Sequence, residues 1–449
     1  KNGTVAQWRE ANDLTAAKYD AAFAGVENMT PPDAVAQAVW DQCQHGTNYF
    51  FPWHRLYLHY FEQVLQQAAN DPTLRLPYWD YTNPAQLAMP AEFTIPTYTN
   101  AQGQVVSNPL YEPRRALGWN APGTKTLNSV DTNIDQALDN PVLLNTTVRG
   151  KTVNGYQRTI ELSPHGYVHC TVIGCRATVM GAVPYSANDP IFYVHHANVD
   201  RLWDCWTSIA GHVNPGGSWL TQQFSYVDAS GKQVTNQVGD LFKPGFIDYV
   251  YEQPSNCARA AARTVPAAAT AAPRAGTVRS ARAALARPAS IGLRTDDLSV
   301  SAPVVRHRLT LPATASLAHP RQFALGDPRE LAVATELTLR GVRFERHPNA
   351  EFRVFLERAD NPAVREFVGT LTFFSQEPTG SAHAHHHGTT ENSFRFDVTD
   401  ALRALRVEGT GTLELNVVVE VEDDDREDFD PQRARLVVDE MELHVRRDQ

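Results

Sequence analysis

Residues 258–290 constrain the fold more than any other segment, because they contain almost no large apolar side chain that could be buried. Ala, Arg, Pro, Ser and Thr dominate them, and this composition is typical of an exposed linker. Trp, Tyr and His are frequent before the linker, whereas short β-branched segments follow it. We therefore expect two folded domains, residues 1–257 and 291–449.

Local patterns predict a different fold class on each side of the linker. Pro52 stands at the head of PWHRLYLHYFEQVLQQAA, where apolar residues recur at helical spacing. After the linker come ELTLRGVRF, EFRVFLE, FVGTLTFF, SFRFDV, TLELNVVVEVE and ARLVVDEMELHV, which are short, β-branched and separated by turn residues. The expected fold is a mainly α domain followed by a β-sandwich.

Charge and hydropathy exclude two kinds of partner. With a formal net charge of -10 and a pI near 5.9, the chain lacks the basic character typical of nucleic-acid binders. No apolar run reaches the roughly 18 to 20 residues that span a bilayer, and the opening KNGTVAQWREAND lacks the apolar core of a signal peptide. We expect a soluble protein, compatible with a bacterial origin, either cytoplasmic or exported and either a single chain or a homo-oligomer.

Most histidines of the first domain fall into three local clusters, each beside aromatic residues and helix signals. The clusters are His45 with His54, His165 with His169, and His195 with His196. His165 and His169 are four residues apart, so on one helix they direct two imidazoles at the same point. A site of neutral imidazoles without carboxylates suits copper or zinc, and no HExxH motif points to a zinc peptidase.

The third cluster lies on a predicted helix that begins at Asp189 and Pro190, a good N-cap and first-turn pair. Neighbouring residues on a helix point about 100° apart. His195 and His196 therefore cannot approach one metal in the same way, and we expect one to bind it while the other supports the site.

The strings that carry these histidines resemble the two copper signatures of the tyrosinase, catechol oxidase and molluscan haemocyanin superfamily. They are CQHGTNYFFPWHRLYLHYFE, LPYWDY, SPHGYVH and NDPIFYVHHANVDRLW, and the resemblance covers roughly residues 35–206. It implies that the first domain is a catalytic four-helix bundle around a binuclear copper site, in which three histidines bind each of two copper ions.

The resemblance also assigns individual residues by motif. It implies that His45 and His54 are the second and third ligands of the first copper, that His165, His169 and His196 bind the second, and that His195 supports without binding. Cys43 matches the cysteine that in many members forms a thioether bond to the histidine two residues later. That bond would use the odd one of the five cysteines.

The first copper site departs from the family pattern. The family takes its first ligand from a helix upstream of the CQHG segment, but residues 1–44 contain no histidine. Either the sequence omits a segment or the site lacks a ligand; we favour omission because the rest of both signatures is intact. His59 is a poor substitute, since it lies about 140° around the helix from His54.

Three further positions refine the expected chemistry. Gly166 stands where an Asn in many monophenol-hydroxylating members helps to hold a water, which favours diphenol oxidation here. Glu161 matches the glutamate that orients this water in plant-type members, so monophenol activity stays open. Val183 aligns with the gate residue above the second copper and would leave the mouth open.

Other features carry weaker expectations. Asp200 and Arg201 are expected to form an ion pair that either orients the copper helices or is purely structural. The cysteines other than Cys43 form two disulfides or remain buried thiols. The cluster His383–His387 is a weak candidate for copper uptake, and the run Glu422–Asp425 is best explained as a solvated turn.

The leading functional hypothesis is a polyphenol oxidase that converts o-diphenols to o-quinones with O2. Residues 291–449 are expected to cover the copper mouth as a lid, so that the enzyme is a latent proenzyme until the linker is cut. The rival from another class is a haemocyanin-like oxygen carrier, and oxidation of o-aminophenols is a third candidate.

Overall fold

The computed structural model forms two compact units. The first comprises Lys1–Cys257, His347–Glu351 and Thr372–Thr390, and the second comprises the remaining segments up to Gln449. The structure describes residues 33–252 except 101, 149 and 176–178, then 257, 293–311 except 301, 333–376 except 349, 392–405, 413–421 and 435–447. The predicted linker 258–290, the cluster His383–His387 and the run Glu422–Asp425 lie outside the described residues.

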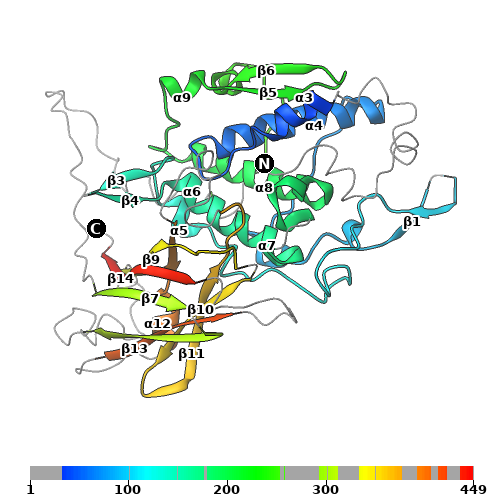
Figure 1. Ribbon diagram of the computed structural model, residues 1–449. Coiled ribbons are helices and arrows are strands. Elements are labelled where there is room, and N and C mark those ends of the chain that lie inside the picture. The colour runs from blue at the N-terminus through cyan, green and yellow to red at the C-terminus, as the bar shows by residue number, and fades with distance from the viewer. Residues whose placement is uncertain are drawn as a thin grey trace, which may run out of the picture. The chain divides into compact units, whose positions relative to one another are not determined.

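Helices build the centre of the first unit (Figure 1). They are α3 (Asp33–Trp40), α4 (Phe50–Ala69), α5 (Asp135–Leu138), α6 (Tyr156–Ile160), α7 (Tyr167–Ile173), α8 (Ile191–Ser208) and α9 (Ser218–Thr221). The two long helices, α4 and α8, pack against each other. Their facing sides are buried, so the histidines that they carry lie in the interior rather than at the surface.

Helix α8 begins where the sequence predicts. The Asp189 carboxylate accepts a hydrogen bond from the main-chain N–H of Ile191 at 3.1 Å, which satisfies one of the unpaired donors of the first turn. The same carboxylate pairs with the Arg115 guanidinium at 2.6 Å, and both side chains are fully buried. The hydrogen bond to Ile191 and the ion pair with Arg115 together fix the start of this helix.

A π-helical turn, η4 (Glu161–Gly166), connects α6 to α7. Ser163 interrupts it with extended backbone, φ -151° and ψ 132°, directly before Pro164. His165 thus lies in the turn and His169 in α7, and their ring centroids are 4.6 Å apart. The two imidazoles lie in one group, as predicted, but the prediction that one helix carries both is wrong, because His165 lies in η4 and His169 in α7.

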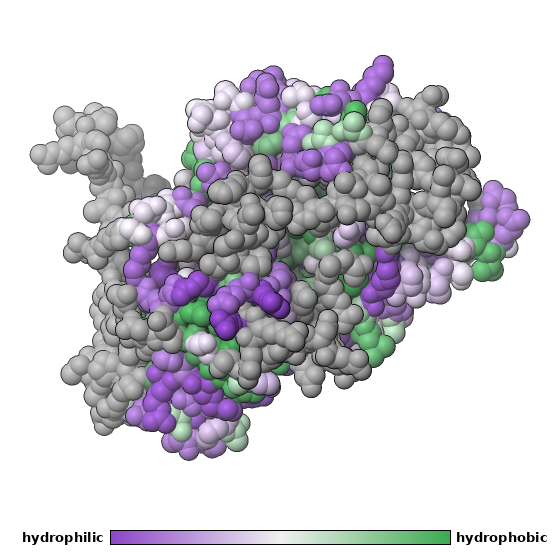
Figure 2. Space-filling model, in the orientation of Figure 1, coloured by the Kyte–Doolittle hydropathy of each residue, from purple (hydrophilic) through white to green (hydrophobic). Residues whose placement is uncertain are grey.

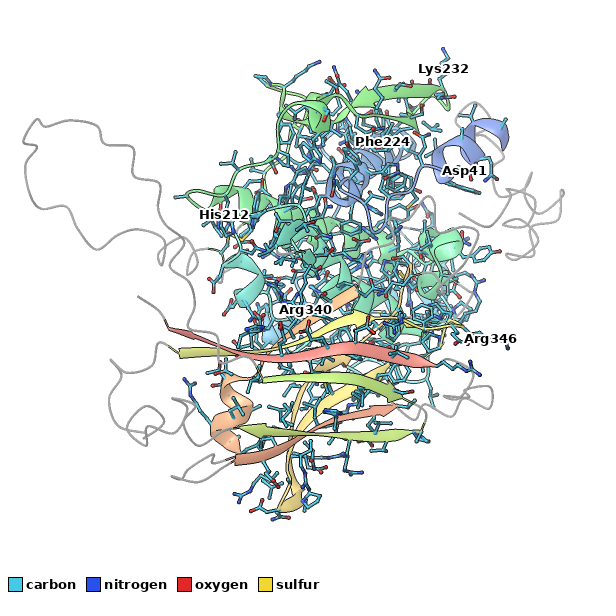
Figure 3. The ribbon with its side chains drawn as sticks, turned by 60° about the vertical axis from the view of Figure 1, so that its left-hand side comes forward. Asp41, His212, Phe224, Lys232, Arg340 and Arg346 are labelled. Carbon is cyan, nitrogen blue, oxygen red and sulfur yellow. A yellow bond between two sulfur atoms is a disulfide. The ribbon has the colours of Figure 1, made fainter. Side chains whose placement is uncertain are left out.

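Short hairpins and 3-10 turns complete the described part of the first unit. The 3-10 turns are η2 (Pro84–Gln86), η3 (Ala91–Phe93), η5 (Val179–Gly181), η6 (Val183–Asn188) and η7 (Val238–Phe242). The hairpins are β1 (Thr97–Thr99) with β2 (Val105–Ser107), β3 (Thr146–Val148) with β4 (Lys151–Val153), and β5 (Gln223–Val227) with β6 (Gln233–Gln237). Strand β5 contacts both α3 and α4. Phe224 on β5 is buried, whereas Lys232 in the following turn points to solvent (Figure 3). The visible side of this hairpin is mostly hydrophilic (Figure 2).

The second unit consists of two four-stranded antiparallel sheets and helix α12 (Thr399–Ala404). One sheet has the order β11-β10-β13-β8 and the other the order β12-β9-β14-β7. The strands are β7 (Leu293–Val300), β8 (Val304–Leu311), β9 (Val333–Val342), β10 (Phe352–Arg358), β11 (Asn361–Leu371), β12 (Asn392–Asp397), β13 (Leu413–Val421) and β14 (Leu436–Arg447). The predicted fold class, a helical domain followed by a β-domain, is confirmed.

One predicted strand is wrong at its end. FVGTLTFF was expected to be extended throughout, but β11 stops at Leu371. Leu371 pairs with Phe352, the first residue of β10, so the following residues have no partner strand beside them. Thr372–Phe374 instead belong to the first unit.

Within the described part of the chain, no helix has both the length and the apolar character needed to cross a bilayer.

Candidate metal centre

Two groups of buried side chains inside the first unit offer metal-binding atoms. The first group contains Cys43, His45 and His54, and the second group contains His165, His169, His195 and His196; within each group the ligand atoms lie within 4.8 Å of one another. All six imidazoles are at most 3% exposed. The three sequence clusters therefore meet in space, as their assignment to one site requires.

Main-chain carbonyl groups fix the orientation of three imidazoles. The Nδ1–H group of His54 donates to Phe50 O at 2.7 Å. His165 donates in the same way to Glu161 O at 2.9 Å, and His169 to Met180 O at 2.7 Å. A carbonyl oxygen can only accept, so Nδ1 carries the proton and Nε2 keeps the lone pair that binds metal.

The second group fits a copper ion. The Nε2 atoms of His169 and His196 are 3.2 Å apart. Two imidazole nitrogens roughly 2.0 Å from one ion at a tetrahedral angle would be about 3.3 Å apart. Among the described residues, no protein atom satisfies the buried Nε2 atom of His165. These three residues would hold the second copper.

His195 and His196 point in different directions, as the helix requires. His196 stacks on His54, with ring centroids 4.5 Å apart and an interplanar angle of 12°, and so faces the first group. His195 lies 5.6 Å from the ring of Tyr81. Its ring nitrogens have no partner in the part of the chain that the structure describes. The ring centroid of His195 is nevertheless 4.9 Å from that of His169 and 5.4 Å from that of His165, so both residues belong to one histidine group. The assignment of His196 as the ligand and His195 as its support stays a prediction.

The first group fits a copper ion only in part. Its donors are two imidazoles and a thiol: the Cys43 Sγ atom is 3.6 Å from His45 Nδ1 and 3.9 Å from His54 Nε2. Among the described residues, no third histidine joins them. His59 is hydrogen-bonded to Gln63 at 2.8 Å and stacks on Phe246, outside the group.

Burial controls the protonation of these side chains. Desolvation lowers the pKa of His54 to about 4 and lowers the pKa values of His165, His169 and His196 well below the ordinary value. Desolvation also raises the pKa of the Cys43 thiol to about 12. The imidazoles are therefore neutral at physiological pH, which is the form that binds metal.

Glu161 is buried beside the site and both of its carboxylate oxygens have partners. One accepts a hydrogen bond from the main-chain N–H of Gly46 at 2.5 Å. The other lies 3.0 Å from the Arg158 guanidinium. Burial raises the pKa of Glu161, and Arg158 opposes that shift. Glu161 thus connects the turn that carries His165 to the loop that carries His45.

A cavity of about 140 Å³ adjoins the first group. His45, Trp53, Tyr57, Val183, Phe192 and Phe374 are among the residues that line it. Val183, the predicted gate residue, begins the 3-10 turn η6 (Val183–Asn188). The cavity is a mainly aromatic space next to the histidines, as a site for a phenolic ring requires.

Phe374 covers the histidines and was missed by sequence reasoning. Its ring stacks on His169 and lies 5.7 Å from His45 and 5.5 Å from His165. Gly166 also lies under this segment: a Cβ atom there would be 3.4 Å from Thr372 Oγ1 and 3.7 Å from Phe374 Cβ. The residues Phe373 and Phe374 looked like the end of a strand, and no local signal marked them.

The predicted Asp200–Arg201 ion pair is wrong. Asp200 pairs with Arg55 of α4 at 2.5 Å and accepts hydrogen bonds from Tyr249 at 3.0 Å and Tyr251 at 2.8 Å. Arg201 pairs with Asp80 at 3.0 Å instead. Residues next to each other on a helix do not face each other, so the two side chains find partners on opposite sides. Asp200 still links α8 to α4, the two long helices of the site.

The cysteines pair in the way that leaves Cys43 free. Cys170 is bonded to Cys175, and Cys205 to Cys257. Of the two arrangements left open by the sequence, disulfides and buried thiols, the structure contains the disulfides. The predicted thioether partner is thus the one unpaired thiol.

Comparison with known proteins shows which domain the first unit contains. Residues 16–209 match the model of the common central domain of tyrosinase. A tyrosinase from Hahella sp. (strain CCB-MM4) is 27% identical over 89% of this chain and 86% of its own length. A chloroplastic polyphenol oxidase from Malus domestica is 25% identical over 83% of this chain, which spans 64% of that protein.

Solved structures share the fold. A latent aurone synthase (polyphenol oxidase) superposes with a TM-score of 0.52 at 19% identity, covering 90% of this chain and 77% of that one. Deoxygenated haemocyanin from Rapana thomasiana gives a TM-score of 0.52 at 15% identity, covering 90% and 85%. Residues 16–209, which contain the histidine groups, thus match the common central domain of tyrosinase, and the chain is similar to tyrosinases and polyphenol oxidases, which are copper-dependent oxidoreductases that bind two copper ions.

Proposed function

We propose that this protein oxidises o-diphenols to o-quinones with molecular oxygen at two copper ions bound by His45, His54, His165, His169 and His196. The observation that carries the proposal is the orientation of His54, His165 and His169. Each already donates through Nδ1 to a main-chain carbonyl and keeps Nε2 free for a metal. Such partners raise the basicity of an imidazole ligand and fix its direction.

The reaction balances without another redox partner. Each o-diphenol gives up two electrons and two protons to become an o-quinone, and two such oxidations reduce one O2 to two water molecules. Copper would supply the exchange of electrons between substrate and oxygen, while the protein binds and orients the substrate. Trp53, Tyr57 and Phe192 offer aromatic walls against which a phenol ring can pack.

Diphenols are the preferred substrate class in this proposal. Gly166 provides no side chain to help hold a water for phenol deprotonation, and Val183 leaves more room at the mouth than an aromatic gate would. The Glu161 carboxylate is already bonded to Gly46 and Arg158. We therefore expect monophenol oxidation to be weaker than diphenol oxidation.

The proposal includes latency, with residues 291–449 acting as a lid. Phe374, which stacks on His169, follows the last residue of β11 by only three positions. Glu351 accepts a hydrogen bond from Thr171 of α7 at 3.0 Å, two residues after His169. The segments that adjoin β10 and β11 in the sequence thus belong to the first unit and contact the helix of the second copper, which supports a covering role for these segments.

Limited proteolysis within 258–290 tests latency. We expect catechol oxidation to increase after the cut and after separation of the C-terminal fragment. An unchanged rate after complete cleavage and separation would count against the lid.

Copper content tests the metal assignment. We expect two copper ions per chain and a near-ultraviolet absorption band on addition of hydrogen peroxide. His54→Ala should lose one copper. His59→Ala, a matched change on the same helix outside the histidine groups, should retain both. One copper in the unmodified protein, with no band, would contradict the copper pair.

An oxygen carrier is the rival function, and the shared fold with haemocyanin does not decide between them. Sustained oxygen uptake with catechol by the protein cut within 258–290 supports the oxidase, whereas reversible oxygen binding without turnover supports the carrier. The same assay with o-aminophenol tests the third candidate.

A further inference from the structure

Two contacts constrain the chain after His169: a disulfide and a hydrogen bond. Cys170 comes directly after His169 and forms a disulfide with Cys175. Five residues further along the chain, Met180 O accepts the hydrogen bond from His169 Nδ1 at 2.7 Å. The disulfide thus constrains the chain at Cys170 and Cys175, and the hydrogen bond to His169 constrains it at Met180. Both cysteines are buried, at 0% and 1% exposure, beside the histidine group.

The backbone next to Met180 is strained. Val179 has a φ of 29°, in a region that a β-branched residue rarely enters, and its side chain is fully buried. Such a conformation persists only where the surrounding structure enforces it. The nearest covalent constraint along the chain is the disulfide at Cys175, four residues before Val179.

The disulfide also packs against the mouth of the site. Cys170 and Cys175 form one buried cluster with Phe374, and Val183 packs on it. The crosslink therefore belongs to the same buried cluster as Phe374, against which Val183 packs, and its second cysteine precedes Met180, the carbonyl partner of His169, by five residues.

We propose that the Cys170–Cys175 disulfide is a positioning element of the second copper site: it holds the Met180 carbonyl against His169 and so slows the loss of copper. This inference rests on the ligand assignment of the proposed function. Loss of a partner that orients a metal-bound histidine typically lowers metal affinity by about 10- to 100-fold.

The test compares two double variants of the copper-loaded full chain. Cys170→Ala with Cys175→Ala removes the crosslink beside His169, and Cys205→Ala with Cys257→Ala removes the other disulfide of the same unit. We expect the first variant to release copper to a chelator about tenfold faster than the unmodified protein, with no comparable change in the second. Equal release from both double variants would overturn the inference.

A second measurement tests the proposal even if the Cys170→Ala/Cys175→Ala variant does not fold. In the copper-free Cys205→Ala/Cys257→Ala protein, the Cys170–Cys175 bond is the one remaining disulfide. Reducing it should accelerate amide hydrogen exchange in residues 179–183, and unchanged exchange there contradicts the proposal. If the unmodified protein binds no copper at all, the proposed function fails; if it binds two and exchange stays unchanged on reduction, only the positioning role fails.

Discussion

The aromatic ring of Phe374 lies parallel to the imidazole of His169, with ring centroids 3.8 Å apart and an interplanar angle of 8°. A phenol ring that approached the second copper from this side would need the same space. In the proposed latent state, the side chain of Phe374 would occupy this space.

Phe374→Ala should raise the catechol oxidation rate of the uncut protein. Removing the ring opens the space beside His169 without cutting the linker, so we expect an increase in kcat/KM of about tenfold, equivalent to about 1.4 kcal/mol. Phe355→Ala on β10 is the matched control, because it also removes a buried phenyl ring from the C-terminal half of the chain but not from the histidines. An equal gain in both variants would mean that general loosening, not uncovering, causes activation.

The copper-free protein should lose stability as the pH falls from about 6.5 toward about 4. The pKa of His54 is lowered to about 4 in the folded state, so between these values the unfolded chain binds more protons, and the free energy of unfolding rises with pH. The shift corresponds to roughly 3 kcal/mol for this residue. His165, His169, His195 and His196 act in the same direction.

Urea unfolding at a series of pH values measures this dependence. His54→Gln should reduce the slope of the unfolding free energy against pH, since it removes one histidine whose pKa is lowered in the folded state. A slope identical to that of the unmodified protein would show that His54 titrates normally in the folded state.

The histidines were predictable from the sequence because their arrangement is local. His165 and His169 lie four residues apart, and His195 and His196 lie on a helix whose start is marked by Asp189. The partner of Asp200 was not predictable, because Arg55 is 145 residues away and no short pattern links them. The contact between Phe374 and His169 was not predictable for the same reason. Phe374 reaches His169 only through tertiary packing, and the residues around Phe374 in the sequence predict a strand.

Asp200→Ala should be strongly destabilising. Arg55 would keep its charge in a buried position, and the hydroxyl groups of Tyr249 and Tyr251 would lose their shared acceptor. We expect a loss of about 3–5 kcal/mol in the free energy of unfolding. Asp248→Ala removes the exposed pair with Arg75 and should cost at most about 1 kcal/mol. Chemical denaturation measures the free energy of unfolding of both variants. Similar losses in Asp200→Ala and Asp248→Ala would show that the Asp200 network contributes no more than a surface ion pair.

Glu161→Ala and Glu161→Gln should differ in their effect. Alanine leaves the Gly46 N–H without its acceptor and Arg158 without its counter-charge, next to the loop of His45. We expect a stability loss of about 1–3 kcal/mol and a lower copper content. Glutamine keeps an acceptor oxygen and should retain most of the copper. Metal analysis measures the copper content of the two variants, and thermal unfolding measures their stability. Full copper retention in the alanine variant would show that Glu161 does not support the first copper site.

The disulfide between Cys205 and Cys257 spans 52 positions of sequence. A backbone nick anywhere inside that span leaves two pieces tied together, which migrate as one species in gel electrophoresis until a reductant is added. A nick beyond Cys257 has no such tie and yields two species at once. A digest that runs as one species without reductant and as two with it was therefore cut between Cys205 and Cys257 or between Cys170 and Cys175, and not within 258–290.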